Sequence, residues 1–344
     1  MSARIQTFDV PVIDFGPVLT GELRALELVA EQVNKACREV GFFYIANAPV
    51  PAGLRHAVLE QSRSFFALPL ADKLSVSMER SHDFRGYIPI DAKLVESNRR
   101  GQGGAGFQLH LADDIIDQHP PDSSESFQIH RELTTDDPDV AAGKPLHGPN
   151  QWPPAAPSLK PVLLEYFNVL RDFSRYVLEV FAIGLGLERD YFARFYTKPL
   201  MQLRLMHYPS HPVASRVPYG VRPHCDAGAF SMLMQDGTGG LEIEDLAGNW
   251  QFVPPLENTL VVNIGDTLKL WSNNRFRSTR HRVINTSGAS RYSVPFFANP
   301  DFDAIITPIE SCVDAEHPPV FDVLRSGESL LHTYSRIWPS SPKE

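Results

Sequence analysis

The chain has 344 residues, 43% of them hydrophobic, and 32 basic against 41 acidic side chains give it a formal net charge of −9. This length allows one domain with extensions or two domains. The acidic balance does not favour a polyanionic partner, so nucleic acid is not an expected substrate. No stretch approaches the roughly 18 apolar residues of a membrane helix, and the first residues carry neither a basic leader nor an apolar secretory segment.

The three cysteines, Cys37, Cys225 and Cys312, are too few and too widely spaced for a disulfide framework. They form no CxxC pair, and they suit a reducing compartment. We therefore expect a cytoplasmic protein.

The N-terminal quarter combines strand and helix patterns. Residues 10–15 (VPVIDF) and 42–47 (FFYIAN) predict two strands. Between them, residues 22–40 place apolar side chains, beginning with Leu23, at alternating steps of three and four, which predicts an amphipathic helix. A second helix is predicted at about residues 51–66.

Residues 80–157 show weaker patterns and are expected to form loops between short elements. They include GQGGAG (101–106), an acid-rich stretch (112–126) and a proline-rich stretch (148–157). GQGGAG lacks the lysine and the serine or threonine of a P-loop, and it lacks the strand and helix that flank a dinucleotide fingerprint. We interpret it as a loop.

The second half of the chain begins with a long helical pattern at residues 158–187, which stops at Gly184 and Gly186. Past residue 200 the apolar period changes to two. Candidate strands are residues 201–208, 229–235, 240–245, 249–253, 259–264, 280–285, 292–297 and 303–309. Many short strands with tight turns predict a mainly β fold with flanking helices, in the form of a double-sheet jelly roll with an α/β N-terminal region.

Three side chains in this strand-rich half form a candidate metal site. In an extended strand, residues i and i+2 point to the same face, so His224 and Asp226 could converge on one ion. His281 follows His224 by 57 residues, inside the alternating segment 280–285. Two imidazoles and one carboxylate form the facial triad typical of Fe(II) oxygenases.

The spacing alone is weak evidence, because 12 histidines and 41 acidic residues in 344 positions give roughly 1.4 His-x-acid pairs by chance. A second pair, His130 and Glu132, lies in the less regular middle region. Solvated or structural histidines are therefore the alternative at both places.

Arg291 and Ser293 lie ten and twelve residues beyond His281 and share one face of a predicted strand. A guanidinium can hold a carboxylate through two parallel hydrogen bonds, and the hydroxyl adds a donor. The pair therefore suits a dicarboxylic 2-oxo acid. An ion pair between Arg291 and a surface acid is the alternative.

Several blocks of sequence surround these residues. In the C-terminal half they are MHYPSHP (206–212), PHCDAGAFSML (223–233), VVNIGDTLKLWSNNRFRSTRHRVIN (261–285) and RYSVPFFANP (291–300). In the N-terminal half they are VPVIDF (10–15), REVGFFYIANAPVP (38–51), FFALPLADK (65–73), SESFQIHRE (124–132) and GPNQWP (148–153). Together these blocks resemble the isopenicillin N synthase-like family of Fe(II)- and 2-oxoglutarate-dependent dioxygenases, over nearly the whole chain.

The resemblance implies a distorted double-stranded β-helix in which residues 1–155 and 156–344 form one integrated catalytic unit. It implies Fe(II), 2-oxoglutarate and O2 as cofactor and cosubstrates. The implied reaction hydroxylates, desaturates or cyclises a small metabolite and forms succinate and CO2. The implied iron ligands are His224, Asp226 and His281, and the implied 2-oxoglutarate contacts are Arg291, Ser293 and Tyr208.

The sequence departs from the family pattern at four positions. Met206 and His207 stand where many relatives have asparagine and tyrosine, and Lys269 stands where glutamine is usual. Met206 thus removes an amide that often contacts the cosubstrate. His130 stands where glycine is common, which favours a drifted position over a ligand pair with Glu132.

The substrate pocket is expected in the loops and strand faces near the matched blocks. Candidate substrate residues are Arg85, Tyr87, Phe107, Gln108, Arg204, Met206 and Phe297, each with ordinary packing as the alternative. Arg85 and Arg204 would suit an acidic substrate. Two other functions stay open: an oxidase of the isopenicillin N synthase type that needs no 2-oxo acid, and a non-catalytic jelly roll that binds a small molecule.

Overall fold

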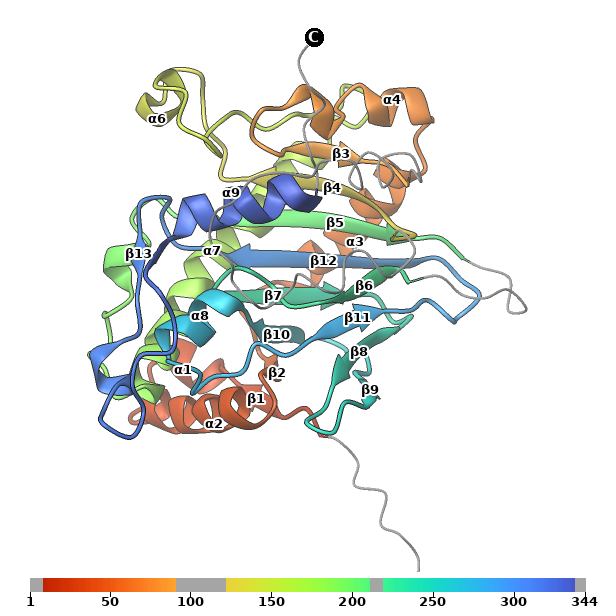
Figure 1. Ribbon diagram of the computed structural model, residues 1–344. Coiled ribbons are helices and arrows are strands. Elements are labelled where there is room, and N and C mark those ends of the chain that lie inside the picture. The colour runs from red at the N-terminus through yellow and green to blue at the C-terminus, as the bar shows by residue number, and fades with distance from the viewer. Residues whose placement is uncertain (1–8, 91–121, 211–218, 338–344) are drawn as a thin grey trace, which may run out of the picture.

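The computed structural model describes residues 9–90, 122–210 and 219–337, and within these ranges two β-sheets face each other (Figure 1). The larger sheet contains, in spatial order, β1 (Val12–Asp14), β2 (Phe42–Ala46), β10 (Leu260–Ile264), β7 (Phe230–Gln235), β12 (Arg291–Ala298), β5 (Gln202–Tyr208), β4 (Glu125–His130) and β3 (Gly86–Ile88). The smaller sheet contains β6 (Val221–His224), β11 (His281–Val283), β8 (Leu241–Glu244) and β9 (Trp250–Phe252). The expected mainly β fold with flanking helices is confirmed.

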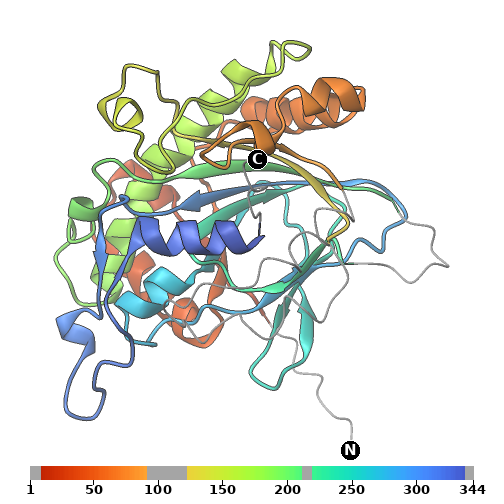
Figure 2. The same cartoon turned by 45° about the horizontal axis from the view of Figure 1, so that its top comes forward.

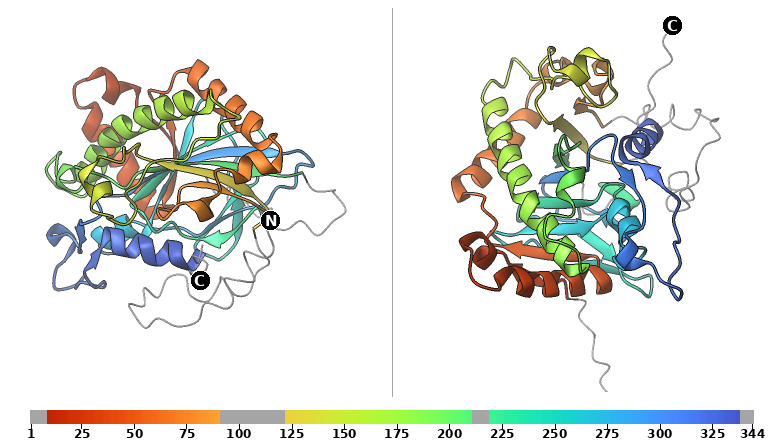
Figure 3. Two further views of the ribbon diagram at one scale, coloured as in Figure 1. Left: turned by 90° about the horizontal axis from the view of Figure 1, so that it is seen from above. Right: turned by 90° about the vertical axis from the view of Figure 1, so that its left-hand side faces the viewer.

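Helices cover the outer face of the larger sheet. The main ones are α2 (Ala25–Glu39), α3 (Ala52–Phe66) and α7 (Leu159–Gly184). Figure 2 shows α3 and α7 side by side, and the right-hand view of Figure 3 shows α7 and the C-terminal helix α9 (Ser326–Ile337) on opposite sides of the larger sheet. Among the described residues, no helix is both long enough and apolar enough to cross a membrane.

The remaining elements are short. They are α1 (Gly16–Thr20), α4 (Leu70–Leu74), α6 (Pro138–Ala141), α8 (Asp266–Trp271), β13 (Ile305–Ile306), β14 (Leu324–Arg325) and the 3₁₀ helices η1 (Met78–Arg80), η2 (Ala193–Phe195) and η3 (Glu310–Cys312).

The two faces of the larger sheet differ in character because side chains alternate along each strand. On β12, Val294 and Phe296 point outward into the core beneath the helices, where Phe296 meets Phe167 of α7 edge to face with ring centroids 5.3 Å apart. Arg291 and Ser293, two residues apart on the same strand, point inward between the sheets. The outer face therefore stabilises the fold, and the inner face is left for binding.

Most elements predicted from the sequence are present, and their ends differ from the predicted ones by a few residues. The first helix begins at Ala25, because Arg24 adopts a left-handed backbone conformation with φ of 63°. Leu23 consequently lies outside the helix and is 93% exposed, so its predicted place in the core is wrong.

The expected loop at 112–126 is also wrong at its end, because Glu125 and Ser126 begin the buried strand β4. This strand buries polar side chains against specific partners, which an apolar period does not reveal. GQGGAG (101–106) lies outside the described residues.

Candidate metal centre and cosubstrate site

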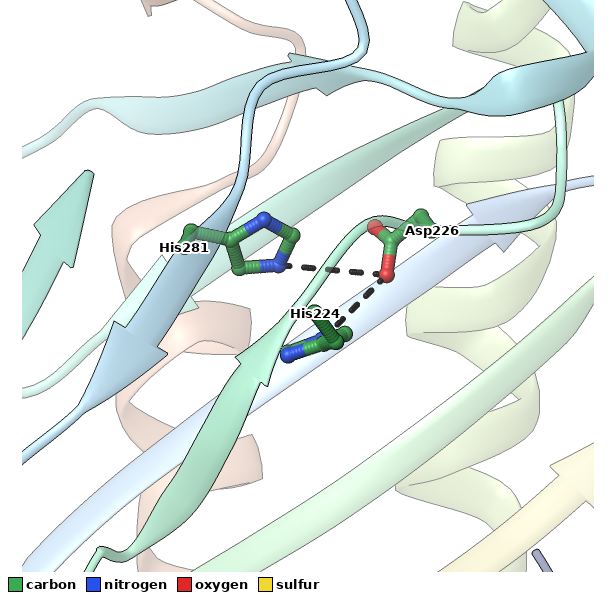
Figure 4. A group of neighbouring side chains, drawn as sticks. All are labelled: His224, Asp226 and His281. Atoms are coloured by element: carbon green, nitrogen blue, oxygen red, sulfur yellow. Dashed lines mark ion pairs between the residues drawn. The ribbon is translucent and has the colours of Figure 1, made fainter. Parts of the chain in front are cut away.

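Three side chains converge at one point: two come from strands of the smaller sheet, and the third comes from the turn that follows β6. β6 and β11 pair so that His224 and His281 stand directly opposite each other, with ring centroids 4.2 Å apart. Nε2 of His224 and Nε2 of His281 lie 3.6 Å and 3.8 Å from Oδ1 of Asp226 (Figure 4). The sequence prediction that these three residues come together is thus met in space.

Asp226 reaches this point from a turn, and the prediction that it continues the strand of His224 is wrong. β6 ends at His224, and the turn that follows docks on the start of α8. The backbone N–H of Asp266 donates to Asp226 O at 2.7 Å, and the Thr267 hydroxyl donates to Ala227 O at 2.9 Å. The turn is therefore held by α8 rather than by the pleat of a strand.

Backbone carbonyls set the orientation of both imidazole rings. Nδ1 of His224 lies 2.8 Å from the carbonyl oxygen of Arg222, and Nδ1 of His281 lies 3.1 Å from that of Thr279. Each Nδ1 therefore carries the proton that it donates, which leaves the Nε2 lone pair of each ring directed at the point of convergence.

The carboxylate of Asp226 is oriented in the same way. Nδ2 of Asn263, on β10, donates to Oδ2 of Asp226 at 2.7 Å, and Oδ1 is the atom that faces both histidines. The Ser231 hydroxyl donates to Oδ1 of Asn263, which fixes the amide with its nitrogen toward Asp226. A polar pair on two neighbouring strands thus supports the acid.

The electrostatics favour an ionised acid between two imidazoles. Burial raises the pKa of Asp226, but the neighbouring His224 and His281 outweigh it and hold the pKa well below its ordinary value. Asp226 in turn outweighs burial at His224 and raises the pKa of that imidazole, so a metal ion that binds Nε2 of His224 competes with a proton there. Burial and then the neighbouring His224 lower the pKa of His281 to about 4, so its ring is neutral at neutral pH. A neutral imidazole and an ionised carboxylate are the states in which these groups bind a metal.

The donor set fits a divalent iron. Two ligands that each lie roughly 2.1 Å from one ion are at most about 4.2 Å apart, and both Nε2 to Oδ1 distances are shorter than this limit. All three ligand atoms lie within 4.8 Å of one another. Two nitrogens and one oxygen on one side of an ion are the donor set of non-haem Fe(II) oxygenases.

Arg291 forms a second polar centre on the inner face of the larger sheet. Its side chain is fully buried, and Nη1 donates to Ser293 Oγ at 3.2 Å while Nη2 donates to Gln235 Oε1 at 2.8 Å. The guanidinium lies 4.6 Å from the ring centroid of Tyr208, whose hydroxyl is 3.3 Å from Ser293 Oγ. Within the described part of the chain, no carboxylate pairs with Arg291, and its Nε has no hydrogen-bond partner.

A fully buried guanidinium surrounded by neutral groups is energetically costly unless an anion completes it. The arginine, the serine hydroxyl and the tyrosine hydroxyl therefore fit one carboxylate of a dicarboxylic cosubstrate. The predicted alternative, an ion pair with a surface acid, is wrong, because Arg291 is buried.

A single cavity between the sheets connects the two centres. Its empty volume is about 590 Å³, including its open mouth. The described residues that line it are Phe42, Arg204, Met206, Tyr208, Val221, His224, Asp226, Ser231, Leu233, Leu241, Asn263, His281, Val283, Arg291, Ser293, Pro295 and Phe297. The predicted pocket residues Arg204, Met206 and Phe297 are among them.

Two other predicted pocket residues do not reach this cavity. Arg85 is buried elsewhere, where it donates to Asn150 Oδ1 at 2.9 Å and to two backbone carbonyls. The Tyr87 hydroxyl donates to Glu125 on the adjacent strand. The expectation that Arg85 and Tyr87 contact the substrate is therefore wrong. Both side chains stabilise the fold, because the loop and strand that carry them face another part of the protein. Phe107 and Gln108 lie outside the described residues.

The second His-x-Glu pair does not form a metal site in the part of the chain that the structure describes. Nε2 of His130 lies 2.9 Å from Nε2 of Gln128. Glu132 instead accepts hydrogen bonds from Asn150 and Trp152 and pairs with Lys160 at 2.9 Å. The two side chains thus serve separate networks.

The sequence analysis missed the residues that support the ligands. Asn263 and Gln235 both lie on inward positions of predicted strands, at 259–264 and 229–235. A single amide at an inward position of an otherwise apolar strand is the signal that could have identified them, because buried amides need partners.

Comparison with known proteins assigns a family to this arrangement. The family description "2OG-Fe(II) oxygenase superfamily" matches residues 199–300, and the description "non-haem dioxygenase in morphine synthesis N-terminal" matches residues 10–155. The 2-oxoglutarate-Fe(II) type oxidoreductase hxnY of Emericella nidulans is 31% identical over 334 residues, which cover 95% of this chain and 90% of that protein. The chain belongs to the 2OG-Fe(II) oxygenase superfamily.

Further similarities support the same assignment. Clavatol oxidase claD of Penicillium crustosum is 34% identical to this oxygenase over 315 residues, which cover 89% of this chain and 90% of that protein. The crystal structure of full-length Neurospora crassa T7H in complex with alpha-KG and thymine matches with a TM-score of 0.78 and 29% identity, over 95% of this chain and 96% of that one.

The fold of this oxygenase is accordingly the double-stranded β-helix, and the enzyme uses Fe(II) and 2-oxoglutarate to oxidise small molecules. Of the three functions left open by the sequence, the similarities support the 2-oxoglutarate-dependent oxygenase over the oxidase that needs no 2-oxo acid and over the non-catalytic jelly roll.

Proposed function

We propose that His224, Asp226 and His281 hold Fe(II), and that Arg291, Ser293 and Tyr208 hold the distal carboxylate of 2-oxoglutarate. The single observation that carries this proposal is the cavity that joins a converging His-Asp-His group to a fully buried arginine whose Nε has no partner among the described residues. The pair of centres matches the two ends of a 2-oxo dicarboxylic acid.

The side chains act by preorganisation. The carbonyls of Arg222 and Thr279 keep Nε2 of each histidine deprotonated, and Asn263 keeps Oδ1 of Asp226 turned toward them. Arg291 orients the cosubstrate by holding its far carboxylate, so that its 2-oxo acid end lies near the metal. Fe(II) with 2-oxoglutarate supplies the activation of O2, which oxidises the substrate and releases succinate and CO2.

The substrate is a small metabolite that is hydroxylated, desaturated or cyclised. Neurospora crassa T7H was solved with thymine, and JOX2 was solved with 2OG, Fe and JA, so related chains accept chemically different small molecules. The cavity that joins the two centres opens to solvent and offers the place for such a ligand.

Two further parts of the proposal concern organisation and location. Residues 1–155 and 156–344 act as one catalytic unit, because β2 pairs with β10 and β4 pairs with β5 across this division. The three cysteines are free, which suits a cytoplasmic enzyme.

Anaerobic titration with Fe(II) and then 2-oxoglutarate tests the site without knowledge of the substrate. His224→Ala, Asp226→Ala and His281→Ala should each abolish Fe(II) binding in calorimetry while the far-UV circular dichroism stays unchanged. Arg291→Met should keep Fe(II) binding and weaken 2-oxoglutarate binding by roughly 10- to 100-fold, because a charged hydrogen-bonded pair is lost.

His317→Ala is the matched control, because this histidine lies on the surface beside Asp314. It should bind iron normally. Normal Fe(II) affinity in any of the three ligand variants would remove that residue from the metal site, and normal 2-oxoglutarate affinity in Arg291→Met would move the distal carboxylate elsewhere.

A further inference from the structure

Arg204 enters the cavity from β5, on the same inward face as Met206 and Tyr208. Its guanidinium lies 5.6 Å from the ring centroid of Phe297, and the cavity that it lines also holds the proposed metal ligands. Burial lowers the pKa of Arg204, and the charges of Tyr334 and then Asp226 act in the opposite direction. Arg204 therefore places a cation on the wall of the cavity within electrostatic reach of the metal centre.

One partner of Arg204 is an amide. Nε and Nη2 of Arg204 both donate to Oε1 of Gln128, which is the residue directly opposite on β4. Two donations that converge on one oxygen hold the guanidinium in one plane. Because an amide is neutral, this contact orients Arg204 without cancelling its charge.

The orientation of Gln128 is itself forced by two acceptors. Its Nε2 donates to the Phe84 carbonyl oxygen at 2.8 Å and lies 2.9 Å from Nε2 of His130. If the amide were flipped, its oxygen would face the carbonyl oxygen of Phe84, and its NH2 group would face the donors of Arg204. Only the observed orientation satisfies every group.

His130 must be neutral to accept this hydrogen bond at Nε2. It is buried, and burial together with the charges of Arg85 and Arg204 lowers its pKa well below the ordinary value. The neutral ring is therefore the stable form around neutral pH. The sequence did not suggest this role for His130. Its ring fixes the orientation of the Gln128 amide, and the amide oxygen fixes the orientation of the Arg204 guanidinium.

Apart from Arg204 and the polar residues of the two centres and their supports, the side chains that line the cavity are apolar. Its apolar side chains are Phe42, Met206, Val221, Leu233, Leu241, Val283, Pro295 and Phe297. Under the proposed function, Arg291 serves the cosubstrate and Asp226 serves the metal. A ligand that matches the remaining features has an apolar body and one anionic group.

We propose that Arg204 determines substrate specificity by binding the carboxylate of a small, mainly apolar monocarboxylic acid, and that Gln128 and His130 are positioning residues that orient its guanidinium. This inference rests on the proposed function, because it assigns the substrate class of the same cavity. The carboxylate on Arg204 anchors one end of the substrate, and the apolar body extends along the wall toward the metal centre.

Binding to the anaerobic full-length enzyme loaded with Fe(II) and 2-oxoglutarate tests the proposal. The probes are phenylacetate, phenylpropionate and octanoate, each paired with its primary amide, which has a similar shape and no charge. Dissociation constants come from calorimetry and from the change in the visible absorption of the iron complex. At least one acid should bind about 10-fold or more tightly than its amide, as expected for a hydrogen-bonded ion pair.

Four variants separate the roles. Arg204→Gln should remove the preference for acid over amide, and Arg204→Lys should keep part of it. His130→Leu should reduce the preference several-fold, whereas His130→Gln, which restores an acceptor, should recover it while amide binding stays constant throughout. Arg282→Gln is the control, because this arginine pairs with Glu242 at 2.6 Å and packs on Trp250 away from the cavity-lining set.

The outcomes are distinct. Equal affinity for acids and amides, failure of every acid to bind, or an acid preference that survives in Arg204→Gln would overturn the proposal. A loss of 2-oxoglutarate affinity in Arg204→Gln would also overturn it, since Arg204 would then serve the cosubstrate. If the unaltered enzyme gives no 2-oxoglutarate-dependent absorption, it is the proposed function that fails, and this is visible before any acid is added.

Discussion

His224 and His281 occupy directly opposed positions of the β6–β11 ladder, although 57 residues separate them in the chain. The backbone pairing of two strands therefore sets the separation of two proposed iron ligands, and the third ligand is added from the turn that leaves β6. Such a site depends on the register of one ladder and on the anchoring of one turn, and these two dependences can be tested separately.

The anchoring of the acid predicts the effect of Asn263→Ala. This change removes the donor to Oδ2 of Asp226 and frees the carboxylate to rotate. Loss of such a supporting hydrogen bond should weaken Fe(II) affinity by roughly 10- to 100-fold, measured by anaerobic calorimetry. Asn249→Ala, in the exposed β8–β9 turn, is the control and should bind iron normally. Unchanged affinity in Asn263→Ala would show that the turn alone orients Asp226.

The turn itself predicts the effect of Gly265→Ala. A Cβ at position 265 would overlap the carbonyl oxygen of Gly228 and approach that of Asp226 to 2.8 Å. The turn would have to move off α8, so Fe(II) affinity should fall by at least about 10-fold, as for other losses of ligand support. Gly237→Ala is the matched control, since a Cβ there meets nothing within 4 Å. Equal iron affinity in both variants would contradict this account of the turn.

Whether the sequence predicts the position of a site residue depends on whether local strand geometry or a contact distant in the chain places that residue. The alternation of side chains in strands placed Arg291 and Ser293 on one face, because the pleat has a period of two wherever a strand forms. For Asp226 the same argument selected a residue that does lie beside both histidines, but strand alternation is not what places it there. Its position depends on contacts with α8, which lies 40 residues further along the chain.

Networks between distant polar side chains were not readable at all. Gln128 and Arg204 become neighbours only through the β4–β5 register, and a hydropathy pattern carries no information on which strands pair. Arg85 shows the converse error. An arginine in a predicted loop near a matched block was expected to bind substrate, but its side chain is buried and donates hydrogen bonds to backbone carbonyls and to Asn150.

The outer core predicts a separation between stability and metal binding. Phe173 of α7 is buried and packs edge to face on Phe15, with ring centroids 5.6 Å apart. Phe173→Ala should lower the free energy of unfolding by about 3–5 kcal/mol, measured by urea denaturation, while the folded fraction keeps normal Fe(II) affinity. Arg171→Ala, on the exposed side of the same helix, should change stability by less than about 1 kcal/mol. A loss of iron affinity in folded Phe173→Ala would mean that the helix layer also sets the geometry of the metal centre.

The last prediction concerns Glu125, a buried acid at the start of β4. It accepts hydrogen bonds from Lys73 Nζ at 2.8 Å, from the Tyr87 hydroxyl and from His207 Nδ1 at 2.8 Å. Burial raises the pKa of Glu125, but these three partners outweigh burial and hold the pKa below its ordinary value. Glu125→Gln leaves Lys73 buried without its counter-charge, so at neutral pH it should destabilise the fold by about 3 kcal/mol.

The pH dependence of this loss follows from the direction of the shift. Because the folded pKa lies below the unfolded value of about 4.3, ionised Glu125 contributes stability above that pH and loses it as the pH falls through the folded pKa. The gap in unfolding free energy between the unaltered protein and Glu125→Gln should therefore shrink in urea denaturation as the pH falls from about 7 to about 3.5. Glu60→Gln, which breaks an exposed pair with Arg63, should cost less than about 1 kcal/mol at either pH. A gap that stays constant with pH would mean that Glu125 is not ionised in the folded protein, and that its partners bind a neutral carboxyl group.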